Sequence, residues 1–219
     1  MSDRSIVRPR DAASLILLRE SASDLEVLIG RRGRTARFMP GRYVFPGGRV
    51  ISADARPWQN ERTGEDSGDR RFAALKRAAL RETFEETGLV VGRRVADAPR
   101  PDAASLVEAA YGEQRLAPAL DMLRLVGRAI TPTQSPIRFH ARFFVADGSD
   151  ASGMLGAGEE LDDVRWHAVD AEAPADMQNV TRFMLRCAVE AWRGHAPATP
   201  PLYWHRGSLS LVRHGSPAR

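Results

Sequence analysis

The hydrophobic and polar positions in the first half of the chain predict strands that lead into one long helix. Residues 13–18 and 25–31 are apolar runs around the polar turn "RESASD", a pattern that predicts a β-hairpin. A short strand in "YVFPGGRV" stops at Pro46 and the two glycines after it. From Arg71 the apolar spacing is helical up to Gly88, where a C-cap glycine belongs. Residues 51–70 are polar and rich in turn residues, so we expect a surface insertion there.

The second half continues the mixture of strands and helices. Its patterns predict a helix at 102–115, strands near 122–130 and 137–146, a polar loop at 147–160, a strand around Trp166, a helix at about 178–193 and a last strand in the tail. Because strands and helices do not alternate strictly, the sequence favours an α+β fold, or an αβα sandwich on a mixed β-sheet. We expect one domain over residues 1–219, with a helical C-terminal part at about 172–219.

Composition excludes several classes of protein. The chain is 43% hydrophobic and 27% charged, values that are ordinary for a globular protein. A formal net charge of only +4 does not indicate a nucleic-acid surface. No run approaches the roughly 18 apolar residues of a membrane span, and the first residues lack the apolar region of a signal peptide. The lone cysteine, Cys187, excludes an intrachain disulfide, so we expect a cytoplasmic protein in which Cys187 is a small core residue.

One stretch places like charges where they should repel. In "RETFEETG", Arg81 to Gly88, the side chains of Glu82, Glu85 and Glu86 share one helical turn, and like charges at such spacing destabilise a helix. Three carboxylates on one face also form an oxygen-rich site that suits Mg²⁺ or Mn²⁺, and a bound cation would remove the repulsion. The alternative is a solvated, acidic helix end.

These residues resemble the second half of the Nudix box, the signature of hydrolases that act on nucleoside diphosphates linked to another moiety. The matching residues are Arg81-Glu82-x-x-Glu85-Glu86-x-Gly88 followed by Leu89, and "FPGG" upstream supplies the glycine of the box in Gly48. The resemblance implies a Nudix-type αβα sandwich and a divalent-metal-dependent hydrolase. It also implies that Glu82, Glu85 and Glu86 hold Mg²⁺ or Mn²⁺, while Arg81 orients the carboxylates through charge-assisted hydrogen bonds.

The chain departs from the family pattern inside the box. Gly48 and Arg81 are 33 positions apart (81 − 48), so an insertion at about 51–70 interrupts the box. The helix register puts Ala73 where the family has an early glutamate, and Glu65 in the insertion is a candidate to replace it.

The resemblance also implies a further carboxylate from a late loop. The stretch "GAGEELDDVRW" offers Glu159, Glu160, Asp162 and Asp163, and the spacing of Glu160 to the tryptophan resembles that of the late-loop glutamate in the family. We expect Glu160 to serve as general base or extra metal ligand, on a loop that approaches the cluster when substrate binds. A solvated acidic loop is the alternative.

Two stretches resemble the coenzyme A diphosphatase branch of the family, including its moiety-X-motif-19 type. The first is Arg37-x3-Gly41-x3-Phe45-Pro46-Gly47-Gly48, although Ile29, Gly30 and Arg31 replace the leucine pair and threonine of that motif. The second is "AITPTQSPIRFHARFFVA", in which His140 stands where that branch tends to carry an acid. The resemblance implies CoA or acyl-CoA as substrate. It implies that Arg37, Gly47 and Gly48 bind this substrate.

The strand at 137–145 carries a cationic face. Alternation puts Arg138, His140, Arg142 and Phe144 on one side, and Arg138 and Arg142 are candidates to bind further phosphate charge, with simple exposure to solvent as the alternative.

Other functions remain open at this point, namely an ADP-ribose/NADH-type pyrophosphatase or a non-catalytic, ligand-sensing regulator with the Nudix fold. The intact glutamate trio favours an enzyme, and no convincing recognition helix points to nucleic acid. We expect a small nucleotide-derived substrate and no nucleic-acid or membrane partner. A homodimer is compatible with the sequence.

Overall fold

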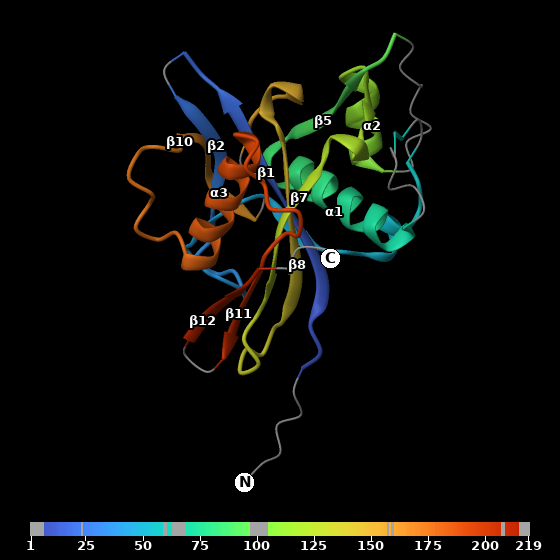
Figure 1. Cartoon of the computed structure of the whole chain (residues 1–219). Coiled ribbons are helices and arrows are strands. Elements are labelled where there is room, and N and C mark those ends of the chain that lie inside the picture. The colour runs from blue at the N-terminus through green and yellow to red at the C-terminus, as the bar shows by residue number, and fades with distance from the viewer. Residues whose placement is uncertain are drawn as a thin grey trace.

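The computed structural model of the chain describes residues 7–22, 24–58, 61–62, 69–96, 105–156, 158, 160–206 and 209–214. Within these residues, the helices are α1 (Arg70–Thr87), α2 (Leu106–Glu113) and α3 (Asn179–Trp192), shown in Figure 1. The strands are β1 (Arg10–Glu20), β2 (Leu25–Arg32), β3 (Tyr43–Val44), β4 (Gly47–Arg49), β5 (Leu89–Arg94), β6 (Leu116–Pro118), β7 (Arg124–Ile130), β8 (Phe139–Asp147), β9 (Ala151–Gly153), β10 (Leu161–Ala168), β11 (Leu202–Arg206) and β12 (Leu209–Arg213).

Most strands join one mixed sheet, and the described residues give it nine strands. Its main order is β10-β2-β1-β8-β7-β11-β12, with β3 paired to β2 and β4 to β1. The β1–β8 and β7–β11 pairs are parallel, and the other neighbours are antiparallel. A smaller sheet has the order β6-β5-β9. The hairpin predicted at 13–18 and 25–31 is confirmed as β1 and β2.

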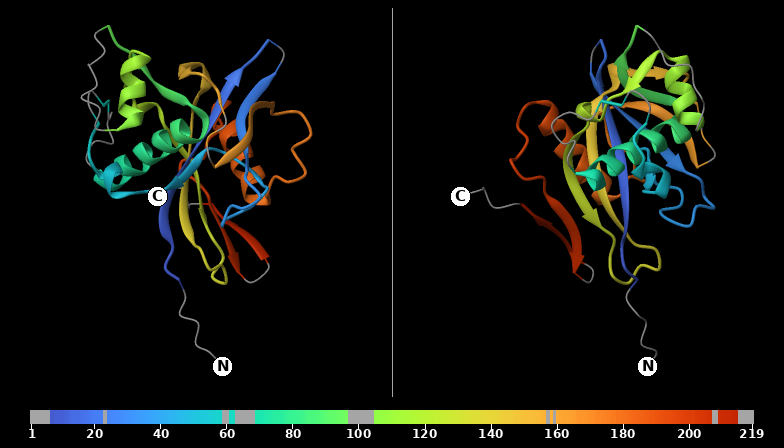
Figure 2. Two further views of the ribbon diagram at one scale, coloured as in Figure 1. Left: turned by 180° about the vertical axis from the view of Figure 1, so that it is seen from behind. Right: turned by 90° about the vertical axis from the view of Figure 1, so that its right-hand side faces the viewer.

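Helices cover both faces of the large sheet because β1 is apolar on both sides. Alternate residues of β1 enter different cores: Leu15 and Leu17 pack in the core under α1, whereas Ile16 and Leu18 pack in the core under α3. The right-hand view of Figure 2 shows α3 on one side of the sheet and α1 with α2 on the other. The expected αβα sandwich on a mixed sheet is therefore confirmed.

The ends of α1 lie where the sequence predicts them. The Asp69 side chain accepts hydrogen bonds from the backbone N–H groups of Arg71 and Phe72, which caps the N-terminus. At the other end Gly88 has φ of 76°, a left-handed conformation that glycine adopts without steric cost, and its N–H donates to Phe84 O at 2.8 Å. No described helix is both long and apolar enough to cross a lipid bilayer.

The segment expected to be a surface insertion at 51–70 is mostly exposed in its described part, but two of its residues are buried. Asp54, in a 3₁₀ turn over Ser52–Ala55, is 1% exposed, and Trp58 packs against Tyr111 in the core. Local polarity did not indicate this anchoring, because the acids Asp54 and Glu61 are buried in ion pairs with Arg81 and Arg77 of α1. Residues 59–60 and 63–68, including the candidate Glu65, lie outside the described residues.

Two other segments differ from their predicted limits. The helix expected at 102–115 begins at Leu106, and residues 97–104 lie outside the described residues. The polar loop expected at 147–160 contains a 3₁₀ turn over Gly148–Asp150 and the strand β9, which pairs with β5. Short edge elements of this kind depend on a partner strand, which local polarity does not reveal.

Candidate active site

The turn at Gly47 and Gly48 lies directly against the glutamates of α1. It belongs to β4, whose pairing with β1 places Gly48 opposite Ala13. The Gly47 N–H donates to Glu86 Oε2 at 2.8 Å. A Cβ on residue 48 would lie 2.4 Å from Glu82 Oε1, so only glycine lets the carboxylate approach the backbone this closely. The structure thus brings the two halves of the predicted motif together.

Arg81 is surrounded by acceptors for all five of its guanidinium N–H groups. Nη1 donates to Glu82 Oε1 at 2.9 Å and to Glu85 Oε2 at 2.7 Å. Nε and Nη2 donate to the two carboxylate oxygens of Asp54 at 2.9 and 3.1 Å, and Nη2 also donates to Arg49 O at 3.1 Å. Burial lowers the pKa of Arg81, but the Asp54 hydrogen bond and the neighbouring carboxylates outweigh it and raise the pKa above its usual value.

Glu86 is the most enclosed carboxylate of the cluster. Its side chain is 3% exposed, and Oε1 is buried without a hydrogen-bond partner among the described residues. Burial raises the pKa of Glu86 to about 8, and the negative charges of Glu82 and Glu160 add to the rise against the opposing Gly47 hydrogen bond and Arg32 charge. Burial likewise raises the pKa of Glu82. The two carboxyls need a cation or a proton to be stable where they are.

Arg32, at the end of β2, lies between two acids of the cluster and was not predicted. Its Nη2 contacts Glu160 Oε2 at 3.0 Å, and its Nη1 is 3.9 Å from Glu86 Oε1. Local sequence could not indicate this role, because Arg32 and Glu160 are 128 positions apart and meet through the β2–β10 pairing.

Glu160 reaches the cluster through a loop that is bonded to the end of α1. Gly156 N donates to Thr87 O at 3.0 Å, and Gly158 N donates to Glu86 O at 3.1 Å. Gly33 N donates to Glu160 O at 3.2 Å. Of the other acids considered in this loop, Asp163 bonds to Tyr43 and Arg165, and Glu159 lies outside the described residues.

The two arginines of the predicted cationic strand face, Arg138 just before β8 and Arg142 on it, are engaged away from the glutamates. Arg138 is buried and donates to Val7 O at 2.7 Å and Thr131 O at 3.2 Å. Arg142 pairs with Asp11 at 2.7 Å, and Arg71, at the N-terminal end of α1, pairs with the same carboxylate at 2.9 Å. The predicted cationic face is thus largely closed by internal contacts, and neither arginine contacts a described glutamate of the cluster.

Arg37 lies on the exposed segment between β2 and β3. This segment is held by Arg32 N, which donates to Arg42 O at 2.9 Å, and it turns at Gly41 with φ of 69°. Within the described part of the chain, no carboxylate lies within ion-pair distance of Arg37. Its guanidinium is therefore free to meet an external anion.

The carboxylate oxygens of the cluster suit a hard divalent cation, although they are not arranged around a common point. Among the described residues, no three His, Cys, Asp or Glu side chains converge closely enough to form a metal site as they stand. Arg81 and Arg32 hold the carboxylates in ion pairs instead. Carboxylate oxygens are the ligands that Mg²⁺ and Mn²⁺ prefer, and the unpartnered Oε1 of Glu86 offers such a ligand.

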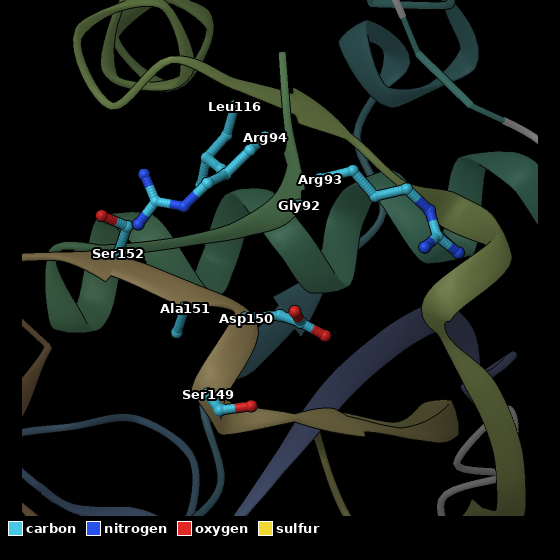
Figure 3. Close-up of a pocket in the computed structure, with 8 residues that line it drawn as sticks. All are labelled: Gly92, Arg93, Arg94, Leu116, Ser149, Asp150, Ala151 and Ser152. Carbon is cyan, nitrogen blue, oxygen red and sulfur yellow. The ribbon is translucent and has the colours of Figure 1, made fainter.

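A separate cavity of about 300 Å³ lies beside the small sheet. Its lining comes from β5, β6 and the segment around β9, including Arg94, Ser149, Asp150 and Ser152 (Figure 3). None of the glutamates of α1 lines it, so we place the candidate active site at the glycine turn and not in this cavity.

Comparison with known proteins agrees with this geometry. No family model matches the chain. The chain is 28% identical over 212 residues to the inferred nudix hydrolase 7 of Caenorhabditis elegans, an alignment that covers 93% of this chain but only 61% of the length of that curated relative. The crystal structure of a NUDIX hydrolase from Alicyclobacillus acidocaldarius is 32% identical, with a TM-score of 0.60, and the match covers 84% of this chain and 93% of that one. A MutT NUDIX hydrolase from Burkholderia pseudomallei, at 18% identity and a TM-score of 0.51 over 82% of this chain and 98% of that one, shares the fold. With the glutamates of α1 against the glycine turn and this degree of similarity, the chain belongs to the Nudix hydrolase family.

Proposed function

We propose that the protein is a divalent-metal-dependent hydrolase that cleaves the pyrophosphate of a nucleoside diphosphate linked to another moiety. One observation carries this proposal: the Glu82 and Glu86 carboxyls lie against the Gly47–Gly48 turn, with Glu86 Oε1 buried and without a partner among the described residues. Such a concentration of buried negative charge is costly unless a cation joins it.

Glu82, Glu85 and Glu86 would hold Mg²⁺ or Mn²⁺. The metal, when bound, polarises a phosphoryl oxygen and lowers the pKa of a coordinated water. The chain itself positions the acids: the Gly47 N–H fixes Glu86, the absence of a side chain at Gly48 admits Glu82, and Arg81 orients Glu82 and Glu85. Glu160, whose side chain is exposed, is the candidate to accept a proton from the attacking water at its carboxylate.

Arg32 supplies the positive charge that a pyrophosphate requires. Its guanidinium pairs with Glu160 and approaches Glu86. A cation on these acids would replace Arg32 as their counter-ion, because both compete for the same oxygens. The guanidinium would then be available to bind a phosphate oxygen beside the metal-binding acids.

We further propose CoA or acyl-CoA as the substrate, cleaved to 3′-phospho-AMP and phosphopantetheine. The support is the Arg37-x3-Gly41-x3-Phe45-Pro46-Gly47-Gly48 pattern, together with the exposed position of Arg37 on the segment that leads into the glycine turn. CoA differs from ADP-ribose by its 3′-phosphate, and Arg37 is the candidate to bind that group. A charge-assisted phosphate contact contributes about 1.5 to 3 kcal/mol, or roughly tenfold to a hundredfold in KM.

A substrate screen tests both levels of the proposal. Initial rates would be compared on CoA, dephospho-CoA, ADP-ribose, NADH and diadenosine tetraphosphate, with Mg²⁺, with Mn²⁺ and after removal of divalent metal. We expect metal-dependent hydrolysis with CoA leading. A lead for ADP-ribose or NADH would contradict the CoA assignment but leave the hydrolase in place, whereas inactivity on every substrate would favour a ligand-sensing regulator.

The role of Arg37 has a matched control in the same exposed segment. Arg37→Ala should raise KM for CoA about tenfold and leave KM for dephospho-CoA nearly unchanged, because only CoA carries the 3′-phosphate. Arg34→Ala removes a guanidinium from the same segment, outside the CoA-like pattern, and should change neither value. Equal losses on both substrates in Arg37→Ala would assign Arg37 to the shared part of the nucleotide.

A further inference from the structure

The strand β10, which follows directly after Glu160, contains one residue more than its partner β2 can match. Asp162 pairs with Arg31, but the next pair along the strands is Arg165 with Ile29. Three steps along β10 (165 − 162) therefore match two steps along β2 (31 − 29), so the chain bulges at residues 163–164.

We infer that Tyr43 is a positioning residue: its hydroxyl holds the bulge at Asp163, and the bulge keeps Glu160 in its place at the candidate active site. The inference rests on the proposed function, in which Glu160 accepts a proton from the attacking water. It adds to that function a role for a tyrosine that lies outside the glutamate cluster.

Asp163 has a backbone conformation that its neighbours must support. Its φ of 49° lies in the left-handed region, which a residue with a side chain adopts only at a cost. The Tyr43 hydroxyl donates to Asp163 Oδ2 at 2.5 Å, and the Arg165 guanidinium pairs with the same oxygen. Arg165 Nη1 also donates to the Tyr43 hydroxyl oxygen at 3.1 Å. Three side chains therefore hold the bulge in one geometry.

Tyr43 reaches the bulge from the opposite edge of β2. β3 pairs with one edge of β2 and β10 with the other, so the Tyr43–Asp163 hydrogen bond passes across β2. Tyr43 is 8% exposed and packs in the core under α3, which fixes the position of its hydroxyl. After β3 the chain enters the glycine turn, where the Gly47 N–H donates to Glu86. The hydrogen bond thus joins the segment before the glycine turn to the strand that follows Glu160.

The location of the bulge decides where Glu160 lies. Leu161 pairs with Arg32, and beside this pair Gly33 N donates to Glu160 O at 3.2 Å. Without the bulge, the extra residue would move to the start of the strand, so that Leu161 would pair with Gly33 and Glu160 would lie beyond it. Such a slip moves the chain by about 3.3 Å and turns each side chain to the other face of the sheet. Glu160 would then leave its place beside Arg32.

The first test compares Tyr43→Phe with Tyr111→Phe in the full chain. Both tyrosines are buried and each loses one hydroxyl hydrogen bond, which Tyr111 donates to Val91 O at 2.8 Å. Thermal unfolding should show similar losses of Tm. Burial of Leu161 also favours the observed register, so we expect only a partial slip in Tyr43→Phe and a fall in kcat of about fivefold. KM should be nearly unchanged, because Glu160 is assigned to the attacking water, and Tyr111→Phe should change neither value. Kinetics would use Mg²⁺ and the leading substrate of the screen.

The register of β10 can be measured without substrate or metal. Arg32 and Leu161 form a pair of the non-hydrogen-bonded kind, in which the α-carbons of facing residues lie about 4.5 Å apart. The wild type should therefore give a nuclear Overhauser cross-peak between their Hα protons. In Tyr43→Phe this peak should weaken and one between Arg32 and Asp162 should appear, while the control variant should match the wild type.

Removing the extra residue gives an independent check. Deletion of Asp163 makes β10 match β2 residue for residue and leaves Leu161 opposite Arg32, so Tyr43→Phe should no longer reduce kcat in this background. Should the deletion fail to fold, Asp163→Ala carries the comparison. It removes the acceptor of the Tyr43 hydroxyl, so its loss of kcat should not add to that of Tyr43→Phe.

The outcomes separate this inference from the proposed function. A wild-type protein that hydrolyses no substrate of the screen would overturn the proposed function itself. An Arg32–Leu161 cross-peak or a kcat that is unchanged in Tyr43→Phe would overturn only the role of Tyr43. Equal losses of kcat from Tyr43→Phe with and without Asp163 would do the same, because Tyr43 would then act elsewhere.

Discussion

The two ends of α1 both carry dense charge, but they balance it differently. At the N-terminal end, Arg71 and Arg142 converge on the single carboxylate of Asp11 and form ion pairs with it within the chain. At the C-terminal end, Arg81 and Arg32 face five carboxylates, those of Asp54, Glu82, Glu85, Glu86 and Glu160. The second cluster has an excess of negative charge that the described residues do not neutralise.

The comparison separates ion pairs that stabilise the fold from charged side chains that are available to bind a ligand. Arg71 precedes Glu82 by 11 positions on α1, which corresponds to about 16 Å along the helix axis. Arg142 therefore pairs at the far end of the helix, whereas Glu86, whose Oε1 has no hydrogen-bond partner among the described residues, lies in the candidate site. The sequence alone does not show whether the charged residues on a strand face are paired within the fold or are available to bind a ligand.

Neutralising Glu86 should have the largest effect on activity. Glu86→Gln removes the buried charge of the cluster, and we expect kcat to fall about a hundredfold or more at saturating Mg²⁺. The Tm of the metal-free protein should rise at pH values above about 8, where the wild-type protein buries an ionised carboxyl. Steady-state kinetics and thermal unfolding measure the two effects, with the exposed Glu113→Gln as control. Near wild-type turnover in Glu86→Gln would remove Glu86 from the metal site.

A methyl group at Gly48 should have a smaller and purely local effect. In Gly48→Ala, the new Cβ would lie within 2.6 Å of the Glu82 carboxyl atoms, so this flexible side chain must move. We expect kcat/KM to fall about tenfold while Tm changes little, because the displaced atoms are the end of a side chain rather than backbone. A fall in Tm without loss of activity would show that the backbone moves instead.

At the opposite end of the helix, Arg142→Ala should affect stability alone. Asp11 would keep its pair with Arg71, so we expect a loss of about 1 kcal/mol in the free energy of unfolding, with kcat and KM unchanged. Denaturant unfolding and substrate kinetics would be measured on one preparation. A specific rise in KM for CoA would instead support the sequence-based assignment of Arg142 to substrate binding.

The pH dependence of stability is expected to be the smallest effect, but it reports most directly on the excess negative charge at the C-terminal end of α1. The pKa of Glu86 is raised from an ordinary 4.5 to about 8, so between these values the folded protein binds a proton that the unfolded chain has released. Stability of the metal-free protein must then fall as pH rises through this window. Burial lowers the pKa of His140 to about 4, which acts in the opposite direction below pH 6.5.

The window from pH 6.5 to 8 therefore isolates the glutamates. We expect Tm of the metal-free protein to decline there by a few degrees, and the decline to be largely absent in Glu86→Gln. Saturating Mg²⁺ should flatten it as well, since a bound cation keeps the carboxyl ionised. A Tm that increases with pH over this range would contradict the assigned pKa.

The success of the prediction from sequence depends on how many positions separate the residues that make each contact. α1 was predicted nearly to the residue, because Gly88 and the apolar spacing that precedes it are signals that act within a few turns. The meeting of Gly48 with Glu82 followed from a family motif. Asp54 and Arg32 were missed, because their partners lie 27 and 128 positions away and only the folded chain defines those contacts.

The sequence separation of contacting residues also determines which contacts can form early and which form late during synthesis on the ribosome. Asp54 and Arg81 are both present once α1 has been synthesised, so the clamp on the inserted segment can form early. Glu160 and its neighbouring strand β10 emerge some 75 positions after α1 has ended, and until then the edge of β2 that β10 will cover is open. An open strand edge invites pairing with other chains. A nascent chain at this stage has no Glu160 and is exposed to aggregation, so hydrolysis should begin only when synthesis has passed β10.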